Sequence, residues 1–296
     1  MRTGSTPSSE RRGNSQPMND SHTFANPDVL EFYKELPFNY QESVDQQVDT
    51  IKSRNSVLSY PVLAERLRPT TTVIEIGCGT GWLSNNIAYH YGSQVRGIDF
   101  NPVAVERANS VARALGVSAS FEVADLFLYQ PEQPADIAVS IGVLHHTDDC
   151  HEAIRRMIAR CVSPGGFAFI GLYHSYGRMP FLDHFQHMKE QGASEEQMFA
   201  RYCELMPQTT DQTHARSWFR DQVLHPHETQ HSLAEMLPLI EECGTELVST
   251  SINRFEPIDD VSNLLQREKE YEGISKQWLR ENRYFPGFFL FLVRKR

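Results

Sequence analysis

The stretch Val73-Ile74-Glu75-Ile76-Gly77-Cys78-Gly79-Thr80-Gly81 decides the fold class of this chain. Its apolar first half predicts a buried strand, and three glycines at alternate positions predict a turn directly after it. A helical stretch follows from Trp82. Glycine has no Cβ, so the backbone can adopt positive φ and approach a ligand closely. This order of strand, turn and helix is typical of a nucleotide-type site at the carboxyl edge of a parallel sheet.

The spacing of the glycines narrows the choice of ligand. A dinucleotide-binding loop has its third glycine at the position that Trp82 occupies here, whereas this chain has Gly81 one residue earlier. A bulky side chain at the start of the helix disfavours a pyrophosphate lying against that helix. We therefore expect a ligand without a pyrophosphate.

Four later segments continue the same pattern of strands. Residues 95–99 predict a second strand that ends in Asp99, which follows Gly77 by 22 residues. An acid about 20 residues after such a loop accepts hydrogen bonds from ribose hydroxyls. The other three segments are a strand over 119–126 that contains Asp125, a strand from 135 that opens into a loop with two histidines, and a turn into a strand over 163–172.

Together, over about residues 55–175, these segments resemble class I S-adenosylmethionine (SAM) dependent methyltransferases. The resemblance implies an α/β fold: a doubly wound, mostly parallel seven-stranded sheet of the Rossmann-like type, with an antiparallel last strand. It implies SAM as co-substrate, with Glu75 near its positively charged end, Asp99 on the ribose and Asp125 on the adenine. The implied cofactor-binding residues are Glu75, Gly77, Cys78, Gly79, Gly81, Asp99, Phe100, Asp125, Leu126, Ile141 and Gly142.

Several of these residues also have an ordinary structural interpretation. Asp is common in turns, so Asp99 and Asp125 could be ordinary residues at the ends of strands. Cys78 is interpreted as a small loop residue rather than a reactive thiol. Glu75 is different, because an acid inside an apolar strand is costly to bury unless it is paired.

The rest of the chain is expected to surround this core in segments. Residues 1–26 have few apolar side chains and are predicted to be disordered, and Met18 is a candidate for the true start. Residues 27–68 form a helical cover, 69–173 the SAM-binding core, 174–230 a helical lid over the acceptor, and 231–296 the end of the core. Helices are predicted over 28–33, 43–67, 82–91, 101–115, 149–161, 181–206 and 229–243, and the last strands over 245–252 and 288–293, separated by an extra segment from 258 to 286.

Composition excludes several classes of partner. The 296 residues carry 28 basic and 38 acidic side chains, a net charge of −10, which disfavours nucleic acid. The sequence lacks an apolar run of the length that a membrane span needs. Five scattered cysteines show neither a disulfide framework nor zinc-ligand spacing, as in a reducing cytoplasm. We expect a small-molecule acceptor and a cytoplasmic protein without a membrane partner; the oligomeric state is open.

The histidines suggest a metal site as an alternative. One donor-rich group runs from His145 to His151, and a second is His225-x-His227-x-x-x-His231. The first group coincides with the fourth motif of the methyltransferase pattern. Histidines in loops near a helix start more often cap the helix or face solvent, so no metal is expected.

The chemistry implied by SAM is in-line displacement at a methyl carbon, where positioning supplies much of the rate. A hydroxyl acceptor needs a general base, and an amine must be neutral when it attacks. His146 is the first candidate for the base, followed by His145, Tyr173 and His174, each with packing or acceptor binding as its alternative role. Aromatic residues that could line an acceptor site are Tyr33, Tyr40 and Trp218.

The leading hypothesis is therefore a SAM-dependent methyltransferase acting on an oxygen or nitrogen of a small molecule. A tRNA or protein methyltransferase is one alternative. A SAM-binding protein with another activity or a regulatory role is a second, because fold alone does not fix function.

Overall fold

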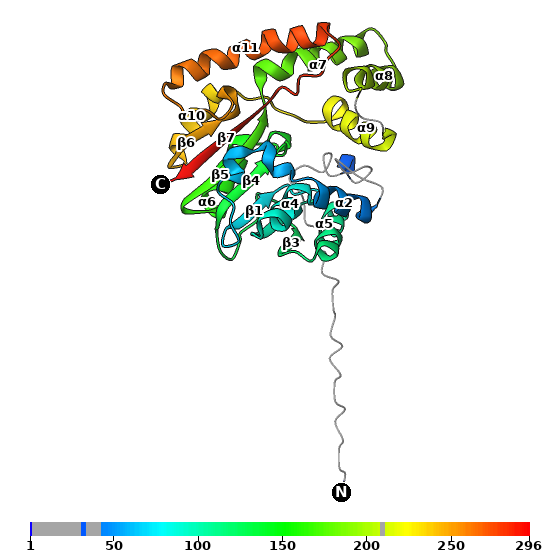
Figure 1. Cartoon of the computed structure of the whole chain (residues 1–296). Coiled ribbons are helices and arrows are strands. Elements are labelled where there is room, and N and C mark those ends of the chain that lie inside the picture. The colour runs from blue at the N-terminus through cyan, green and yellow to red at the C-terminus, as the bar shows by residue number, and fades with distance from the viewer. Residues whose placement is uncertain (2–30, 34–42, 208–210) are drawn as a thin grey trace.

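A seven-stranded sheet forms the centre of the computed structural model, which describes residues 1, 31–33, 43–207 and 211–296 (Figure 1). Its strand order is β3-β2-β1-β4-β5-β7-β6, and β7 runs antiparallel to both of its neighbours while the other pairs are parallel. This confirms the doubly wound, mostly parallel sheet. The strands are β1 (Thr72–Ile76), β2 (Gln94–Asp99), β3 (Ala119–Val123), β4 (Ala135–Ile141), β5 (Val162–Tyr173), β6 (Thr245–Thr250) and β7 (Phe288–Lys295).

Helices cover both faces of the sheet because successive side chains of each strand point to opposite faces. Val73 of β1 packs with Ile87 of α4 (Trp82–Tyr91), whereas its neighbour Ile74 belongs to the core that contains α6 (Cys150–Cys161) and α10 (Leu233–Glu242). The first face is completed by α2 (Val44–Ser53), α3 (Pro61–Ala64) and α5 (Pro102–Leu115). The helices predicted over 82–91, 101–115 and 149–161 are confirmed, with the side chains of Asn101 and Asp149 capping the last two.

The single helix predicted over 43–67 is wrong. Helix α2 ends at Ser53, a 3₁₀ turn follows at Ser56–Ser59, and α3 begins at Pro61. The side chain of Asn55 accepts a hydrogen bond from the backbone N–H of Val57 and so caps the turn, while Pro61 occupies the first position of α3. Asparagine caps and proline at a helix start both favour a new element over a continuous helix.

Several predicted boundaries also differ from the structure. Strand β3 ends at Val123, so Asp125 lies in the turn beyond it, and β6 ends at Thr250 rather than 252. Helix α10 begins at Leu233 because Ser232 and Glu235 form a capping box there. The stretch 181–206 is two helices, separated near Gly192, which adopts a φ of +82°.

A second, helical layer lies above the sheet in Figure 1. Helix α7 (Ser175–Glu190) and α11 (Val261–Arg280) pack side by side, and α8 (Glu195–Leu205) and α9 (Gln212–Phe219) lie at one end of this pair. They share their own apolar core, which includes Phe181, Tyr202 and Phe219. A π-helical turn, Arg220–Leu224, follows α9.

Several predictions fall on parts of the chain outside the described residues. These are the disordered tail at 1–26, the role of Met18, most of the helix at 28–33 and the cover that contains Tyr40; residues 31–33 are helical. Among the described helices, none is long and apolar enough to cross a membrane.

Candidate functional site

One cavity of about 780 Å³ lies where the glycine turn meets the ends of β2 and β4. It is positioned at the change of strand order between β1 and β4, the place where open α/β sheets bind ligands. Most of the residues proposed for the cofactor line it: Glu75, Gly77, Cys78, Gly79, Asp99, Phe100, Asp125, Leu126, Ile141 and Gly142. His146 and Tyr173 also line it, whereas Gly81, His145 and His174 do not.

The three glycines of the turn have different roles. Gly77, Gly79 and Gly81 all adopt positive φ, at 71°, 51° and 78°. A Cβ on Gly77 would lie 2.4 Å from the side chain of Val143, and one on Gly81 would lie 2.8 Å from Cβ of Ala108. A Cβ on Gly79 would meet no described atom within 4 Å. Gly77 and Gly81 therefore allow close packing of the protein itself, while Gly79 leaves space open in the cavity.

Asp99 ends β2 with its carboxylate under the glycine turn. One oxygen accepts a hydrogen bond from the backbone N–H of Gly79 at 2.8 Å, and the other accepts one from Asn101 at 2.9 Å. Burial raises the pKa of Asp99, against these hydrogen bonds, which lower it. Each carboxylate oxygen can accept a second hydrogen bond, so the group keeps capacity for ligand hydroxyls.

Glu75 faces helix α4 from the middle of β1. Its carboxylate accepts hydrogen bonds from the backbone N–H of Ser84, at 3.0 Å, and from the Ser84 hydroxyl. Burial raises the pKa of Glu75 to about 8, although both contacts with Ser84 favour the ionised form. The acid that the sequence places in an apolar strand is thus paired, and it lies on the wall of the cavity.

A polar network around Asp221 also lines the cavity; the sequence indicated Tyr33 and Tyr173 but not Asp221, Gln222 or Tyr284. The Tyr33 hydroxyl donates to Oδ1 of Asp221 at 2.5 Å, and Nε2 of Gln222 donates to Oδ2 of Asp221 at 2.8 Å. The same nitrogen contacts the Tyr173 hydroxyl at 2.6 Å, and the Tyr284 hydroxyl donates to Oε1 of Gln222 at 2.7 Å. All five side chains line the cavity, and Asp221 and Gln222 belong to the π-helical turn. Such turns occur often at functional sites.

A buried arginine supports this network from behind. Arg178 of α7 is fully buried and forms two hydrogen bonds with the carboxylate of Glu228, at 3.0 and 2.8 Å. It also donates to the side chain and backbone oxygens of Gln222, and its guanidinium lies 4.0 Å from the centre of the Tyr173 ring. The positive charge of Arg178 is thereby balanced by Glu228, and it orients Gln222.

His146 lines the cavity, and its ring is buried. Its Nδ1 lies 2.9 Å from the carbonyl oxygen of His227, which can only accept, so Nδ1 carries the proton. Nε2 then has a lone pair, and it has no hydrogen-bond partner among the described residues. Burial lowers the pKa of His146 to about 4, and the ring stacks on His225 with centroids 3.7 Å apart. His146 is therefore neutral near pH 7, with Nε2 unprotonated.

The other two candidate histidines are buried in the packing around the site. His145 has no exposed surface, and its Nδ1 accepts a hydrogen bond from the backbone N–H of Tyr173. His174 is also fully buried, with Nε2 3.2 Å from Glu268 and Nδ1 accepting from the N–H of Gly177. Glu268 in turn caps α10 through Leu233. The structure thus brings only His146 and Tyr173, of the four candidates, to the cavity.

The comparisons with known proteins agree with this geometry. A family model described as a methyltransferase domain matches residues 73–166, the segment from β1 to the start of β5. Over these residues the chain resembles the class I SAM-dependent methyltransferases, as its sequence motifs indicated.

Curated relatives of this methyltransferase domain resemble only part of the chain. Norajmaline N-methyltransferase of Rauvolfia serpentina is 35% identical over 96 residues, which cover 31% of this chain and 32% of the relative. The 2-methyl-6-phytyl-1,4-hydroquinone methyltransferase of Synechocystis is 34% identical over 107 residues, which cover 36% of this chain and 33% of the relative. The ubiquinone biosynthesis O-methyltransferase of Proteus mirabilis is 27% identical over 152 residues, which cover 49% of this chain and 61% of the relative. The chain thus spans about a third of the first two relatives.

Two solved structures show the same fold at low sequence identity. PKMT2 from Rickettsia typhi, in complex with AdoHcy, has a TM-score of 0.55 and 16% identity, over 77% of this chain and 50% of that one. Magnesium protoporphyrin IX methyltransferase from Synechocystis, with bound SAH, has a TM-score of 0.51 and 13% identity. The match covers 90% of this chain and 92% of that one.

The cavity of the methyltransferase domain fits SAM by charge as well as by position. SAM carries a positive sulfonium and a positive amino group at one end, and the cavity wall holds Glu75, Asp99 and Asp125. The open space at Gly79 allows a ligand to approach the backbone there. The residues present therefore fit SAM.

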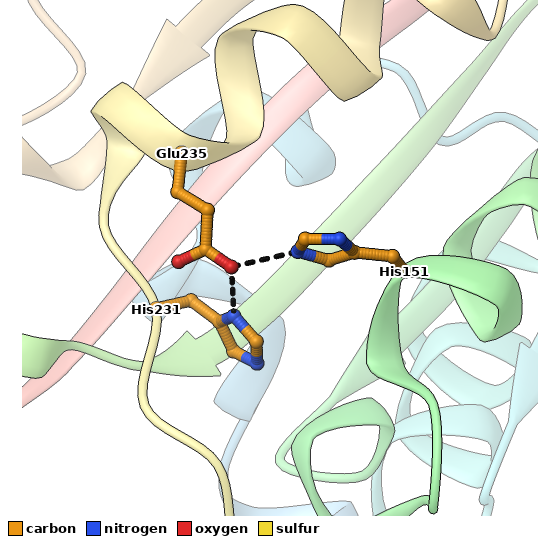
Figure 2. Close-up of side chains that lie close together, drawn as sticks. All are labelled: His151, His231 and Glu235. Carbon is orange, nitrogen blue, oxygen red and sulfur yellow. Dashed lines mark hydrogen bonds and ion pairs between the residues drawn. The ribbon is translucent and has the colours of Figure 1, made fainter.

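One histidine from each of the two histidine-rich segments meets a glutamate away from the cavity, in a combination that the sequence did not predict. His151 of α6 and His231 each place a ring nitrogen on Oε1 of Glu235, at 2.7 and 2.9 Å (Figure 2). This is the one group of three or more potential metal ligands in the described part of the chain. The contacts already join the three side chains directly, and none of the three lines the cavity. The cluster ties α6 to the start of α10.

Proposed function

We propose that the protein transfers the methyl group of SAM to an oxygen or nitrogen of a small-molecule acceptor. The observation that carries this proposal is the continuity of the cavity. The residues expected to bind SAM line the same cavity as Tyr173, Asp221, Gln222 and Tyr284. The relatives whose names specify N- or O-methyl transfer to small molecules support the same class of reaction.

The roles of the residues follow from the geometry. Asp99 and Asp125 hold the nucleoside end of SAM, and Glu75 lies toward its charged end. The polar network around Asp221 orients the acceptor, so that its nucleophile lies in line with the methyl–sulfur bond; such positioning supplies much of the rate. Nε2 of His146 accepts the proton that the acceptor loses, because its lone pair has no partner among the described residues.

The acidic balance of the chain supports a small molecule over a nucleic acid. All five cysteines are free thiols, which supports a reducing compartment such as the cytoplasm. No metal is needed for the proposed reaction, since the sulfonium leaving group is already activated.

The test is formation of S-adenosylhomocysteine when the purified protein receives SAM and a small-molecule extract. We expect product that depends on the extract and survives treatment of the extract with nuclease and protease. Product that disappears after nuclease or protease treatment would replace the proposal with a macromolecular acceptor. Tight SAM binding without turnover on any fraction would favour a regulatory SAM-binding protein instead.

A further inference from the structure

The described wall of the cavity is rich in acids and holds neither lysine nor arginine. Its acidic side chains are Glu75, Asp99, Asp125, Asp148 and Asp221. Its one basic side chain in the described part of the chain is His146, which burial keeps neutral near pH 7. A carboxylate or phosphate acceptor would therefore meet acids and no cationic partner on this wall, which disfavours binding.

Asp221 is the acid that belongs to the acceptor end of the cavity. It is 5% exposed, and its partners are the neutral side chains of Tyr33, Tyr173 and Gln222. Within the described ranges, neither lysine nor arginine forms an ion pair with it; the nearby Arg178 pairs with Glu228 instead. A buried carboxylate without a cationic partner is costly, and a cationic ligand would relieve that cost.

Several of the aromatic rings that line the cavity lie around Asp221. Tyr33 and Tyr173 contact Asp221 directly, Tyr284 contacts its neighbour Gln222, and Phe288 packs against Tyr173. The face of an aromatic ring attracts ammonium ions, most strongly where water is excluded. A carboxylate combined with several rings is a combination that recognises a positively charged nitrogen rather than a hydroxyl.

We propose that the acceptor is an amine that binds as an ammonium ion between Asp221 and these aromatic rings. The inference rests on the proposed methyl transfer and specifies its acceptor atom as nitrogen. Asp221 and the rings select the amine.

The proposed reaction balances without a further reactant. The ammonium must first lose its proton, which the nearby positive sulfonium promotes because it disfavours a second cation; the proton occupies Nε2 of His146 only in transit, because burial lowers the pKa of that ring to about 4. The nitrogen lone pair then forms the bond to the methyl carbon as the carbon–sulfur bond breaks. The electron pair of that bond stays on sulfur, giving neutral S-adenosylhomocysteine and a methylated ammonium product. The proton on His146 passes to solvent.

The test uses three ligands of similar size: 2-phenylethylamine, 2-phenylethanol and 3-phenylpropanoate. Each is titrated by calorimetry into the wild-type protein saturated with S-adenosylhomocysteine. We expect the amine to bind at least about 10-fold more tightly than the alcohol and the carboxylate to bind most weakly. Equal binding of amine and alcohol, or preference for the carboxylate, would overturn the proposal.

Two variants connect the preference to Asp221. Asp221→Asn should reduce amine affinity by about 10- to 100-fold and leave alcohol affinity within about threefold. The exposed Asp259→Asn removes the same charge elsewhere and should change neither. Retained amine preference in folded Asp221→Asn would contradict the inference. If the variant does not fold, the comparison of the three ligands on wild type still decides the question.

The same experiment separates the inference from the proposed function. The titration begins with S-adenosylhomocysteine alone. If that ligand binds and the amine shows no preference, the acceptor class is wrong and methyl transfer stands. If S-adenosylhomocysteine does not bind, the proposed function itself fails.

Discussion

Nδ1 of His146 lies 2.9 Å from the carbonyl oxygen of His227, and this contact fixes which nitrogen of the ring is free to act as a base. The carbonyl holds the proton on Nδ1 and directs the lone pair of Nε2 away from it. His227, which supplies the carbonyl, is 81 residues away from His146 in the sequence. A base role for His146 therefore depends on the segment that precedes α10.

Replacement of His146 tests that role directly. His146→Ala should lower kcat by about 10²- to 10⁴-fold, the usual range for a general base, and change SAM affinity by less than about threefold. The exposed His187→Ala, on α7, is the matched control and should retain activity. Steady-state kinetics and SAM calorimetry measure the two effects, and a loss confined to SAM binding would refute the base role.

Substitutions of two glycines in the turn should affect stability and SAM binding differently. Gly77→Ala should destabilise the protein by about 2–5 kcal/mol, because its Cβ overlaps Val143 and its φ is positive. Gly79→Ala should cost only about 1–2 kcal/mol, the strain of positive φ, since its Cβ meets open space. That methyl group enters the cavity, so SAM affinity should still fall at least about 10-fold. Denaturant unfolding measures the stability of both variants, and calorimetry measures their SAM affinity. Equal destabilisation of the two variants would contradict the assigned roles.

Glu75 should make stability depend on pH in a defined direction. Its pKa is raised to about 8 from an ordinary 4.5, so between these values the folded state holds a proton that the unfolded state releases. Stability from this group is full below about pH 4.5 and is lost as pH rises toward 8. Glu75→Gln removes this dependence, so its unfolding free energy relative to wild type should rise with pH, by at most about 1.4 kcal/mol per unit.

The matched control for this experiment is Glu132→Gln, at an exposed position. Its unfolding free energy relative to wild type should be constant over the same range. If the unfolding free energy of Glu75→Gln relative to wild type is also constant with pH, Glu75 is ionised over the whole range, contrary to the effect of its burial.

Chelation should leave activity unchanged. The cluster of His151, His231 and Glu235 is joined by direct hydrogen bonds and lies off the cavity wall (Figure 2). We expect elemental analysis of the purified protein to find no stoichiometric metal and turnover to persist in EDTA. Activity that EDTA removes and zinc restores, in wild type but not in His151→Ala, would instead make this cluster a functional metal site.

The sequence predicted those parts of the structure that local signals specify. Apolar runs, alternate glycines and the cap at Asn101 predicted the strands and helices from β1 to α5, because each depends on neighbouring residues. The single helix over 43–67 failed because Asn55 and Pro61 interrupt an otherwise helical apolar spacing. That interruption was visible in the sequence, as an asparagine cap and a proline.

Tyr33 and Trp218, proposed for the acceptor site from the sequence, do line the cavity, but Asp221, Gln222 and Tyr284 could not be predicted in the same way. Asp221 contacts Tyr33 across 188 residues, and Tyr284 contacts Gln222 across 62. No local pattern encodes such pairs, and only the packing of α7, α9 and α11 over the sheet brings them together. His174 shows the reverse error: its place after β5 suggested catalysis, but it pairs with Glu268, 94 residues away.

The central claim is that this cavity binds SAM through Asp99. Calorimetric titration of SAM and S-adenosylhomocysteine into wild type and Asp99→Ala tests it most directly, with thermal unfolding to show that the variant is folded. We predict tight binding of both ligands by wild type and loss of that binding in the variant. Absence of binding by wild type, or equal binding by the folded variant, would contradict the claim.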